Sequence, residues 1–294
     1  MRPVVVVTGA SAGVGLATSL AFARRGWAVT LAARDPAPLA VAARRCGPTA
    51  LVVPTDVASE TAVNELADAV MTRYGRMDAW INNAAVASFG PVEATPVSEV
   101  RAILETNVIG YLNGVRAALP CLRLSGGGVI VNVSSAVGAI GHPSGMGYAM
   151  SKFAVRGLAR SLRQELLLAG EDNIKVCTVL PSSVDTPLYG NAANYSGLRL
   201  RPIPPAYPAE RVARAILRMV GHPRREVYVG AAGRLTAGAY PWAPGLIDRL
   251  YAKMVARTQL GPEPAPPTSG NLRRPWHSEL PAKLIRSAAE LMPV

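Results

Sequence analysis

Three side chains in the middle of the chain have the types and the spacing needed for proton transfer. Tyr148 and Lys152 are four residues apart in a segment of helical pattern, so both project from one face, a turn apart. A tyrosine titrates near about 10, but an ammonium group at about 4 Å favours its phenolate by roughly 4 kcal/mol at an effective dielectric constant of about 20. Ser135 ends a predicted strand, where open parallel sheets bind ligands. This set predicts acid–base chemistry at a substrate oxygen.

A glycine-rich loop near the N-terminus has the context of a phosphate-binding site. Residues 8–15 read TGASAGVG, after the apolar run Val4–Val7 and at the start of a helical pattern. Glycine permits positive φ and close backbone approach, while the free N–H groups and the dipole of a helix start attract a pyrophosphate. The strand before the loop and the helix after it are the context that such a motif requires, so we expect a bound nucleotide.

The elements that must position these residues alternate between short strands and longer helices. Apolar, β-branched runs predict strands at Val4–Thr8, Ala28–Ala33, Ala50–Pro54, Ala79–Asn82, Gly128–Ser134, Ile174–Leu180 and Glu226–Val229. Helical periodicity predicts helices at Gly13–Arg25, Pro36–Arg45, Glu60–Tyr74, Ser98–Leu119, Tyr148–Leu168 and Pro208–Val220. This alternation is typical of an α/β fold, a doubly wound parallel sheet of about seven strands with helices on both faces.

With these motifs in place, the chain resembles the short-chain dehydrogenase/reductase family over roughly residues 3–230. The resemblance rests on the spacing Gly-x-x-x-Gly-x-Gly and Ser-x12-Tyr-x3-Lys, on Asp56-Val57 after the third strand, and on Asn82-Asn83-Ala84 after the fourth. Ala85 and Ser182 depart from the family, which usually has glycine there, and we expect altered loops rather than lost binding. The resemblance implies a single Rossmann-like catalytic domain over residues 1–230, followed by an extension over residues 231–294.

The resemblance also implies a role for each catalytic residue. Tyr148 protonates a carbonyl oxygen during reduction, Ser135 donates a hydrogen bond to that oxygen, and hydride comes from C4 of a nicotinamide. Lys152 favours the Tyr148 phenolate and binds the nicotinamide ribose. Asn107 matches the family's asparagine in the preceding long helix and is expected to hold a water that connects Lys152 to solvent.

The expected cofactor site draws on loops from several strands. The resemblance places Asp56 near the adenine, Asn83 against the adenosine ribose, and Val184 and Thr186 near the nicotinamide and its phosphate. The full set of predicted cofactor-binding residues is Gly9, Ser11, Ala12, Gly13, Val14, Gly15, Arg34, Asp56, Val57, Asn83, Ala84, Tyr148, Lys152, Pro181, Val184 and Thr186.

The end of the second strand favours NADP(H) over NAD(H). In NAD-preferring relatives an acid stands at the position of Ala33, where it accepts hydrogen bonds from the adenosine ribose. Here Arg34 follows directly, and its guanidinium can pair with a 2′-phosphate that an acid would repel. Asp35 argues the other way, because it lies about 20 residues past Gly15, where the general dinucleotide motif has its acid.

The segment Pro187–Tyr207 follows the nicotinamide-contacting loop and is expected to close over substrate. Its aliphatic and aromatic residues favour a small lipophilic ketone or secondary alcohol. Arg199 and Arg201 could bind a substrate carboxylate or an acyl-carrier phosphate, or they could face water. The alternatives are therefore a 3-oxoacyl thioester reductase and, from a different class, a non-catalytic NADP-binding sensor or scaffold.

The extension is rich in proline and only partly helical. Leu246, Ile247, Leu250, Tyr251, Met254 and Val255 fall on one face of a predicted helix, and that stripe must be covered. We expect it to pack on the body or on another subunit, with peripheral membrane contact as the alternative. The family usually forms dimers or tetramers, so we expect a homo-oligomer.

The composition excludes several classes of protein. With 294 residues, 50% of them hydrophobic, the chain buries a core without disulfides. Cys46, Cys121 and Cys177 are too widely spaced for a disulfide framework or a zinc site, so we expect no metal. The net charge of +12 is spread along the chain, so we expect no nucleic-acid partner. The chain shows no signal-peptide pattern and no apolar run of about 18 residues, so we expect a cytoplasmic protein.

Overall fold

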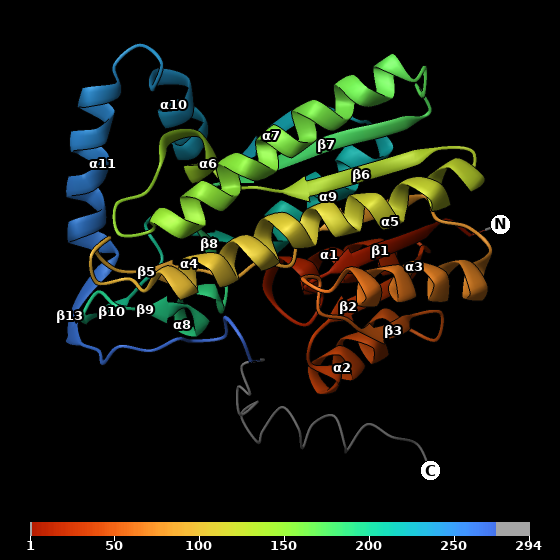
Figure 1. Cartoon of the computed structure of the whole chain (residues 1–294), viewed down its shortest axis with the longest axis horizontal. Helices are drawn as coiled ribbons and strands as arrows, with labels where there is room; N and C mark the ends of the chain where they lie inside the picture. Colours follow the sequence, from red (N-terminus) through yellow and green to blue (C-terminus); the bar gives the residue numbers. More distant parts are fainter. Residues whose placement is uncertain (1, 275–294) are drawn as a thin grey trace.

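The computed structural model describes residues 2–274 and confirms the predicted parallel sheet (Figure 1). Seven strands lie in the order β12-β7-β6-β4-β1-β2-β3, and every neighbouring pair is parallel. Their bounds are β1 Val4–Thr8, β2 Ala28–Ala33, β3 Leu51–Pro54, β4 Ala79–Asn82, β6 Gly128–Val133, β7 Ile174–Pro181 and β12 Glu226–Val229. The connections from β1 and β4 run to opposite sides, so a ligand crevice opens at the carboxyl ends of these central strands.

Helices cover both faces of the sheet, which explains why the strands are apolar along their whole length. Val4 and Val6 of β1 pack against α3 (Glu60–Tyr74), α5 (Gly110–Leu124) and α7 (Met146–Leu168). Val5 and Val7 face the other way, toward α1 (Gly13–Arg24), α2 (Pro36–Cys46) and α9 (Ala209–Gly221). Each face thus has its own apolar core, as a doubly wound sheet requires.

One predicted helix is broken into three parts. We expected a continuous helix over Ser98–Leu119, but the structure has α4 (Val97–Leu104), a π-helical turn η1 (Glu105–Ile109) and then α5. The break coincides with Asn107, whose side-chain amide bonds to the backbone of Val86 in a neighbouring loop. Such a π turn often marks a functional site.

Short elements gather above the carboxyl end of the sheet. These are β5 (Ser88–Phe89), α6 (Val137–Ile140), β8 (Val184–Asp185), α8 (Leu188–Asn191), β9 (Ala193–Asn194), β10 (Leu198–Leu200) and β11 (Tyr207–Pro208). β5 pairs with β9, and β8 pairs with β11. These pairings hold the segment Pro187–Tyr207 above the carboxyl end of the sheet, and its closure over substrate stays a prediction.

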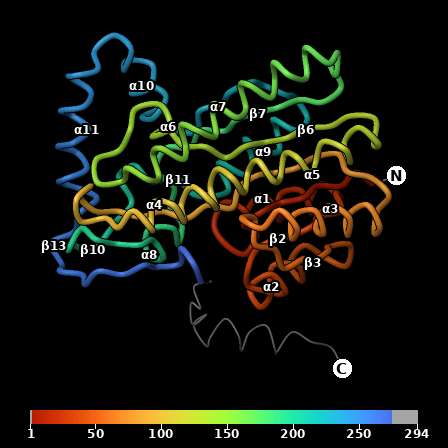
Figure 2. The backbone as a smooth tube through the Cα atoms, in the orientation of Figure 1, coloured from red at the N-terminus to blue at the C-terminus, as the bar shows by residue number. Residues whose placement is uncertain are grey.

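The extension packs along one end of the body instead of forming a separate core. It begins with the helical pair α10 (Ala231–Ala239) and α11 (Pro244–Thr258) at the upper left of Figure 1, and continues in β13 (Leu260–Pro264), which pairs with β10. The tube in Figure 2 then runs beneath β10 and α8 toward α2. Residues 275–294 of the predicted extension lie outside the described part of the chain.

The predicted apolar stripe on α11 is covered only in part by the chain itself. Val255 is buried and Tyr251 is half-buried, but Leu246 and Leu250 are 57% and 55% exposed. The body therefore covers part of the stripe and leaves Leu246 and Leu250 exposed, and the alternative that another subunit covers them stays a prediction.

Candidate active site

The phosphate loop between β1 and α1 depends on two glycines. Gly9 has φ of +64°, and a Cβ there would lie 2.8 Å from the Cα of Ala84. A Cβ on Gly15 would lie 2.1 Å from the carbonyl oxygen of Gly9. Asn83 donates from Nδ2 to the carbonyl oxygens of Thr8, at 2.9 Å, and Gly9. The loop therefore has the tight turn and open backbone that a pyrophosphate needs.

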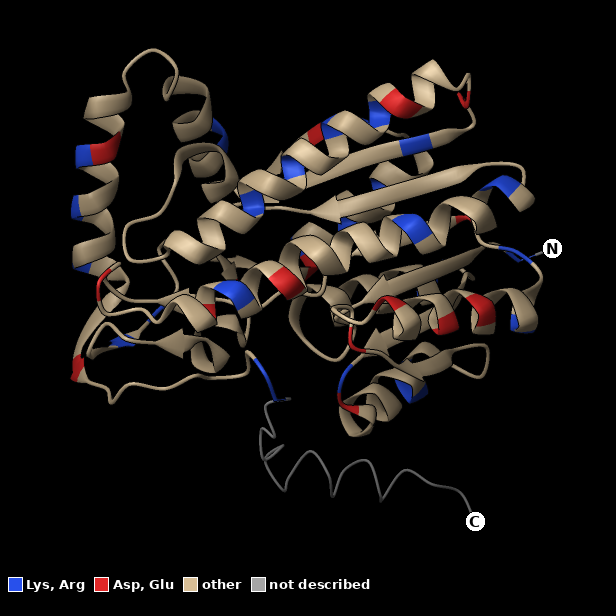
Figure 3. Ribbon diagram, in the orientation of Figure 1, with Lys and Arg blue, Asp and Glu red and all other residues tan. Residues whose placement is uncertain are grey.

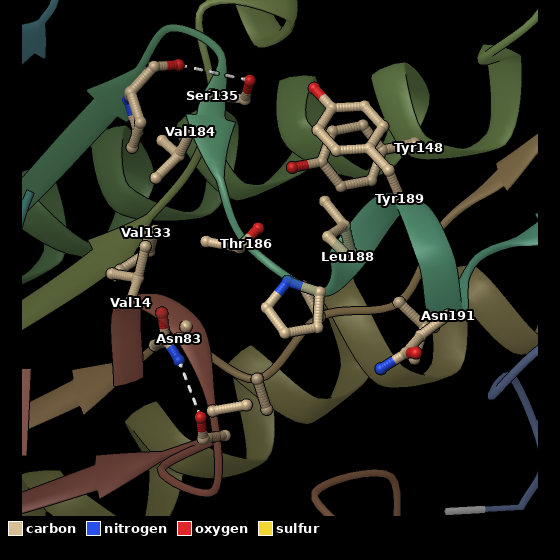
Figure 4. A pocket seen from close by; sticks show the side chains of 18 of the residues that line it. Val14, Asn83, Val133, Ser135, Tyr148, Val184, Thr186, Leu188, Tyr189 and Asn191 are labelled. Carbon is tan, nitrogen blue, oxygen red and sulfur yellow. Dashed lines mark hydrogen bonds between the residues drawn. The ribbon is translucent and has the colours of Figure 1, made fainter. Parts of the chain in front are cut away.

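A cavity of about 1250 Å³ opens above this loop and runs to the extension. Fifteen of the sixteen predicted cofactor residues line this cavity: Gly9, Ser11, Ala12, Gly13, Val14, Arg34, Asp56, Val57, Asn83, Ala84, Tyr148, Lys152, Pro181, Val184 and Thr186. Figure 4 shows Val14, Asn83, Val184 and Thr186 around one part of it. Gly15 and Asn107 lie behind the lining rather than on it. The site is large enough for a dinucleotide and a small substrate together.

Lys152 is held deep in the site with its ammonium group directed at protein oxygens. The residue is 1% exposed, and Nζ donates to the carbonyl oxygen of Val133 at 2.8 Å and to the hydroxyl of Tyr111 at 3.5 Å. Nζ also lies 5.4 Å from the ring centre of Tyr148. Burial lowers the pKa of Lys152 to about 7. The pair thus lies close together on α7, as the four-residue spacing predicts.

The pKa of Tyr148 moves opposite to the expected direction. Burial raises it, the neighbouring Tyr189 hydroxyl raises it further, and a hydrogen bond with Ser135 opposes the increase. Figure 4 shows Tyr148 and Tyr189 next to one another, with Ser135 at the side. The expectation of a lowered pKa considered only the charge of Lys152 and omitted the desolvation of a phenol that is set into the cavity wall.

The Asn107 side chain connects η1 to the loop at Val86 and to α7. Its Oδ1 accepts from the backbone N–H of Val86 at 2.8 Å, and its Nδ2 donates to the Val86 carbonyl oxygen and to Ser151 Oγ, both at 2.9 Å. These bonds use both N–H donors of the amide and one of the two acceptor sites of its oxygen, and they tie η1 to α7. Its predicted role in holding a water beside Lys152 stays a prediction.

At the adenosine end, Arg34 and Asp35 have distinct partners. Arg34 donates from Nη1 to the carbonyl oxygen of Leu272 at 3.1 Å and from Nη2 to that of Asn271 at 2.6 Å. Burial lowers its pKa, and the nearby Asp56 raises it. Asp35 caps α2, with Oδ1 accepting from the N–H of Ala37 at 3.0 Å. The extension thus reaches the residue on which the predicted cofactor preference depends.

At the other end of the cavity four aromatic side chains form a continuous series. Phe89 stacks on Tyr189 with ring centres 5.9 Å apart, and it meets His142 edge-on at 5.6 Å. His142 in turn meets Tyr251 of α11 at 5.7 Å. Sequence analysis did not identify Phe89 or Tyr251 as site residues. The place of Phe89 depends on the pairing of β5 with β9, and that of Tyr251 depends on where α11 packs.

The two arginines of the substrate segment are paired outside the cavity. Arg199 Nη1 lies 3.1 Å from Glu263 Oε2, and Arg201 Nη2 lies 2.9 Å from Glu263 Oε1, with all three side chains substantially exposed. Neither arginine lines the cavity. The two arginines therefore face water rather than a substrate carboxylate or phosphate in the cavity.

Other charges and thiols form no further site in the described part of the chain. Figure 3 shows Lys and Arg scattered over the helices of the body and along α11. Cys46, Cys121 and Cys177 are free thiols. Among residues 2–274, no group of three or more His, Cys, Asp or Glu side chains is arranged to hold a metal ion. Within the same range, no helix combines the length and the apolar character needed to cross a membrane.

Comparison with known proteins agrees with this geometry. The model of the short chain dehydrogenase family matches residues 3–195. The uncharacterized oxidoreductase YxnA of Bacillus subtilis is 35% identical over 274 residues, which cover 90% of this chain and 75% of that protein. An alcohol dehydrogenase of Thermococcus sibiricus, solved with 5-hydroxy-NADP, is 28% identical with a TM-score of 0.69, over 78% of this chain and 96% of the other. A short-chain dehydrogenase/reductase of Burkholderia phymatum, solved with NAD, is 25% identical with a TM-score of 0.74, over 83% and 95%.

Proposed function

This chain belongs to the short-chain dehydrogenase/reductase family, and we propose that it transfers hydride reversibly between NADP(H) and a lipophilic ketone or secondary alcohol. Members of this family are oxidoreductases that act on alcohol and carbonyl groups. The observation that carries the proposal is the convergence of Ser135, Tyr148 and Lys152 on one cavity that also contains the glycine loop.

In the proposed reduction, bound NADPH supplies the hydride that reaches the carbonyl carbon. Tyr148 donates its phenolic proton to the carbonyl oxygen, and Ser135 donates a hydrogen bond to that oxygen. The raised pKa of Tyr148 keeps this proton in place at neutral pH. In the reverse direction Tyr148 takes the proton from the alcohol, and the positive charge of Lys152 stabilises the phenolate that precedes this step.

Arg34 supports NADP as the cofactor. A guanidinium has five N–H donors, and two of its nitrogens already donate to the carbonyl oxygens of residues 271 and 272. The remaining donors suit a 2′-phosphate, and the bonds to the extension fix the group beside the cavity. The position of Asp35 in the sequence favours NAD, but its carboxylate caps α2, which weakens that argument. The similar solved structures include complexes with either type of cofactor, so this choice depends on the residues of this chain.

The two alternatives have less support. A thioester reductase that recognises a carrier phosphate needs a free cation near the substrate, whereas Arg199 and Arg201 are both paired with Glu263. A non-catalytic NADP sensor does not need the proton-transfer pair, yet Tyr148 and Lys152 are both present and close together.

Cofactor binding and turnover test the proposal together. We would titrate NADPH and NADH into the wild-type protein and a Tyr148→Phe variant, and then follow NADPH oxidation with lipophilic ketones and acyl thioesters. We expect both proteins to bind NADPH more tightly than NADH and only the wild type to turn over ketones. Tighter NADH binding would refute the interpretation of Arg34, and turnover of thioesters alone would favour the first alternative.

Self-association is proposed through η1, α5 and α7, which cover the same face of the sheet (Figure 1). Apolar side chains are exposed there: Ile109 and Leu112 at 38% each, Met150 at 47% and Phe153 at 46%. Such a patch suits a symmetric contact between two copies. Light scattering of the full chain should give a dimer or tetramer, and Phe153→Arg should reduce that mass. Membrane contact through the extension and a cytoplasmic location stay predictions.

A further inference from the structure

The substrate end of the cavity differs in charge from the cofactor end. The charged residues that line the cofactor end are Arg34, Asp35, Arg44, Arg45 and Asp56. At the substrate end, Lys152 is the one charged residue among the lining residues that the structure describes. His142 also lines this end, and burial lowers its pKa, so it is neutral at pH 7. A substrate with a charged group would find no partner of opposite sign there apart from Lys152, which is engaged by protein oxygens.

Aromatic rings occupy this uncharged end from several separate elements. Phe89 comes from β5, His142 from the loop after α6, Tyr189 from α8 and Tyr251 from α11, and consecutive ring centres are 5.6 to 5.9 Å apart. Tyr251 lines the same cavity as Tyr148 and is connected to Tyr189 through His142 and Phe89. Aromatic side chains favour contacts with other rings beyond the area that they bury.

The position of Tyr251 is fixed by contacts made by the extension on both sides of α11. Before α11, the N–H of Gly233 donates to Ser182 Oγ at 3.0 Å, at a position where the family usually has glycine and therefore no hydroxyl. After α11, β13 pairs with β10 of the substrate segment, and Glu263 pairs with Arg199 and Arg201. The helix therefore belongs to the site rather than to an independent appendage.

We infer that α11 forms one side of the substrate site through Tyr251 and Met254, and that this chain takes an uncharged ketone or secondary alcohol that carries a ring. This inference rests on the proposed function and narrows its substrate class. The reacting carbon lies toward Tyr148, and the ring contacts Tyr251 and His142. The substrate site is completed within one subunit by a helix that follows the catalytic domain in the sequence.

Binding to catalytically disabled protein tests the inference independently of turnover. The probes are 2-acetylnaphthalene, its charged analogue 6-acetyl-2-naphthoate, and 2-butanone, which has no ring. Affinities are measured by calorimetry in Tyr148→Phe protein saturated with NADPH, alone and combined with Tyr251→Ala, Tyr251→Phe or Leu250→Ala. Leu250 is the matched control, because it neighbours Tyr251 on α11 and is 55% exposed.

We expect Tyr251→Ala to weaken the binding of 2-acetylnaphthalene about ten-fold, a loss typical of removing one aromatic contact. The affinity should stay within about three-fold of the parent value in Tyr251→Phe and should not change in Leu250→Ala. The carboxylate analogue should bind at least about ten-fold more weakly than the neutral ketone, since its charge is desolvated without a partner. With Tyr148 intact, the ratio of kcat/KM for 2-acetylnaphthalene to that for 2-butanone should fall about ten-fold in Tyr251→Ala, mainly through KM.

Several results would overturn the inference: no detectable binding of 2-acetylnaphthalene, equal effects of Tyr251→Ala and Leu250→Ala, or equal affinities for the neutral and charged ketones. Unchanged NADPH affinity and thermal unfolding in each variant show that the fold is intact. Binding that depends on Tyr251 without turnover in the wild type would reject the proposed function while supporting this substrate site. Turnover of ketones that is insensitive to Tyr251 would support the proposed function and reject this substrate site.

Discussion

Replacing Arg273 by glutamine should loosen the end of the described chain without unfolding the body. Arg273 Nη1 donates to both carboxylate oxygens of Glu99 in α4 at 2.9 Å. Tyr195 and Ser269 donate their hydroxyls to Glu99 Oε1 at 3.2 and 3.1 Å. The Glu99 side chain is only 6% exposed and that of Arg273 is 50% exposed. A buried carboxylate is therefore one of the points at which the extension is attached to the body.

The size of the effect follows from this difference in exposure. A hydrogen bond to a charged group contributes about 1.5–3 kcal/mol, whereas a fully exposed ion pair contributes at most about 1 kcal/mol. Since one partner is buried and the other half-exposed, we expect Arg273→Gln to cost about 2 kcal/mol, with Glu99 keeping two hydroxyl donors. Each ~1.4 kcal/mol is a factor of ten, so opening of this segment should become about 30-fold more frequent.

Amide hydrogen exchange measures this opening directly. The N–H of Thr268 donates to the carbonyl oxygen of Asn194 at 3.0 Å, and the N–H of Asn271 donates to that of Asn191 at 2.9 Å. Both amides should exchange about 30-fold faster in the variant, while amides of the central sheet should not change, because the loss is local. Arg257→Gln, which removes an exposed charge from α11, is the control. Equal acceleration in the sheet, or none at residues 268 and 271, would refute the reasoning.

Three further substitutions test other parts of the site. Gly15→Ala forces a Cβ to 2.1 Å from a backbone oxygen of Gly9, so thermal unfolding should show a loss of about 1–3 kcal/mol and NADPH titration a clear loss of affinity. The pKa of Lys152 is lowered to about 7 in the folded protein, so between pH 7 and about 10.5 the unfolded chain binds one more proton than the folded chain. Across this window the free energy of unfolding of the wild type should therefore rise with pH relative to that of Lys152→Met. A difference that falls with pH would contradict the lowered pKa. Ser182→Gly removes the acceptor for the N–H of Gly233, so denaturant unfolding should show a loss of about 1 kcal/mol, whereas an unchanged midpoint would mean that α10 is held by other contacts.

The sequence was sufficient to predict the central sheet because its signals are local. A run such as Val4–Val7 is apolar on both sides, which is typical of a buried parallel strand, and the glycine loop after it fixes where the helix begins. The spacing of Tyr148 and Lys152 on one helix likewise determines their proximity without any knowledge of packing. The seven strands and the gathering of these residues at one edge follow from such local patterns.

The rest could not be predicted, because it depends on contacts between distant segments. Glu263 meets Arg199 and Arg201 only once β13 has paired with β10, and nothing in the sequence around Glu263 indicates that pairing. The π turn at Asn107 arises from bonds to Val86, which lies in another loop. The direction of the pKa change at Tyr148 depends on desolvation within the cavity, a property of the assembled fold rather than of the spacing.

The extension makes the two ends of the cavity depend on one segment of chain. At the adenosine end, the carbonyl oxygens of Asn271 and Leu272 accept from Arg34, while at the substrate end Tyr251 meets His142 edge-on. Both ends lie on a body whose strands and phosphate loop are the common framework of the family, so neither contact is required for the fold of the sheet. If the proposed cofactor and substrate contacts hold, we expect substitutions in the extension to alter cofactor choice and substrate choice while the Tyr148 and Lys152 pair stays in place.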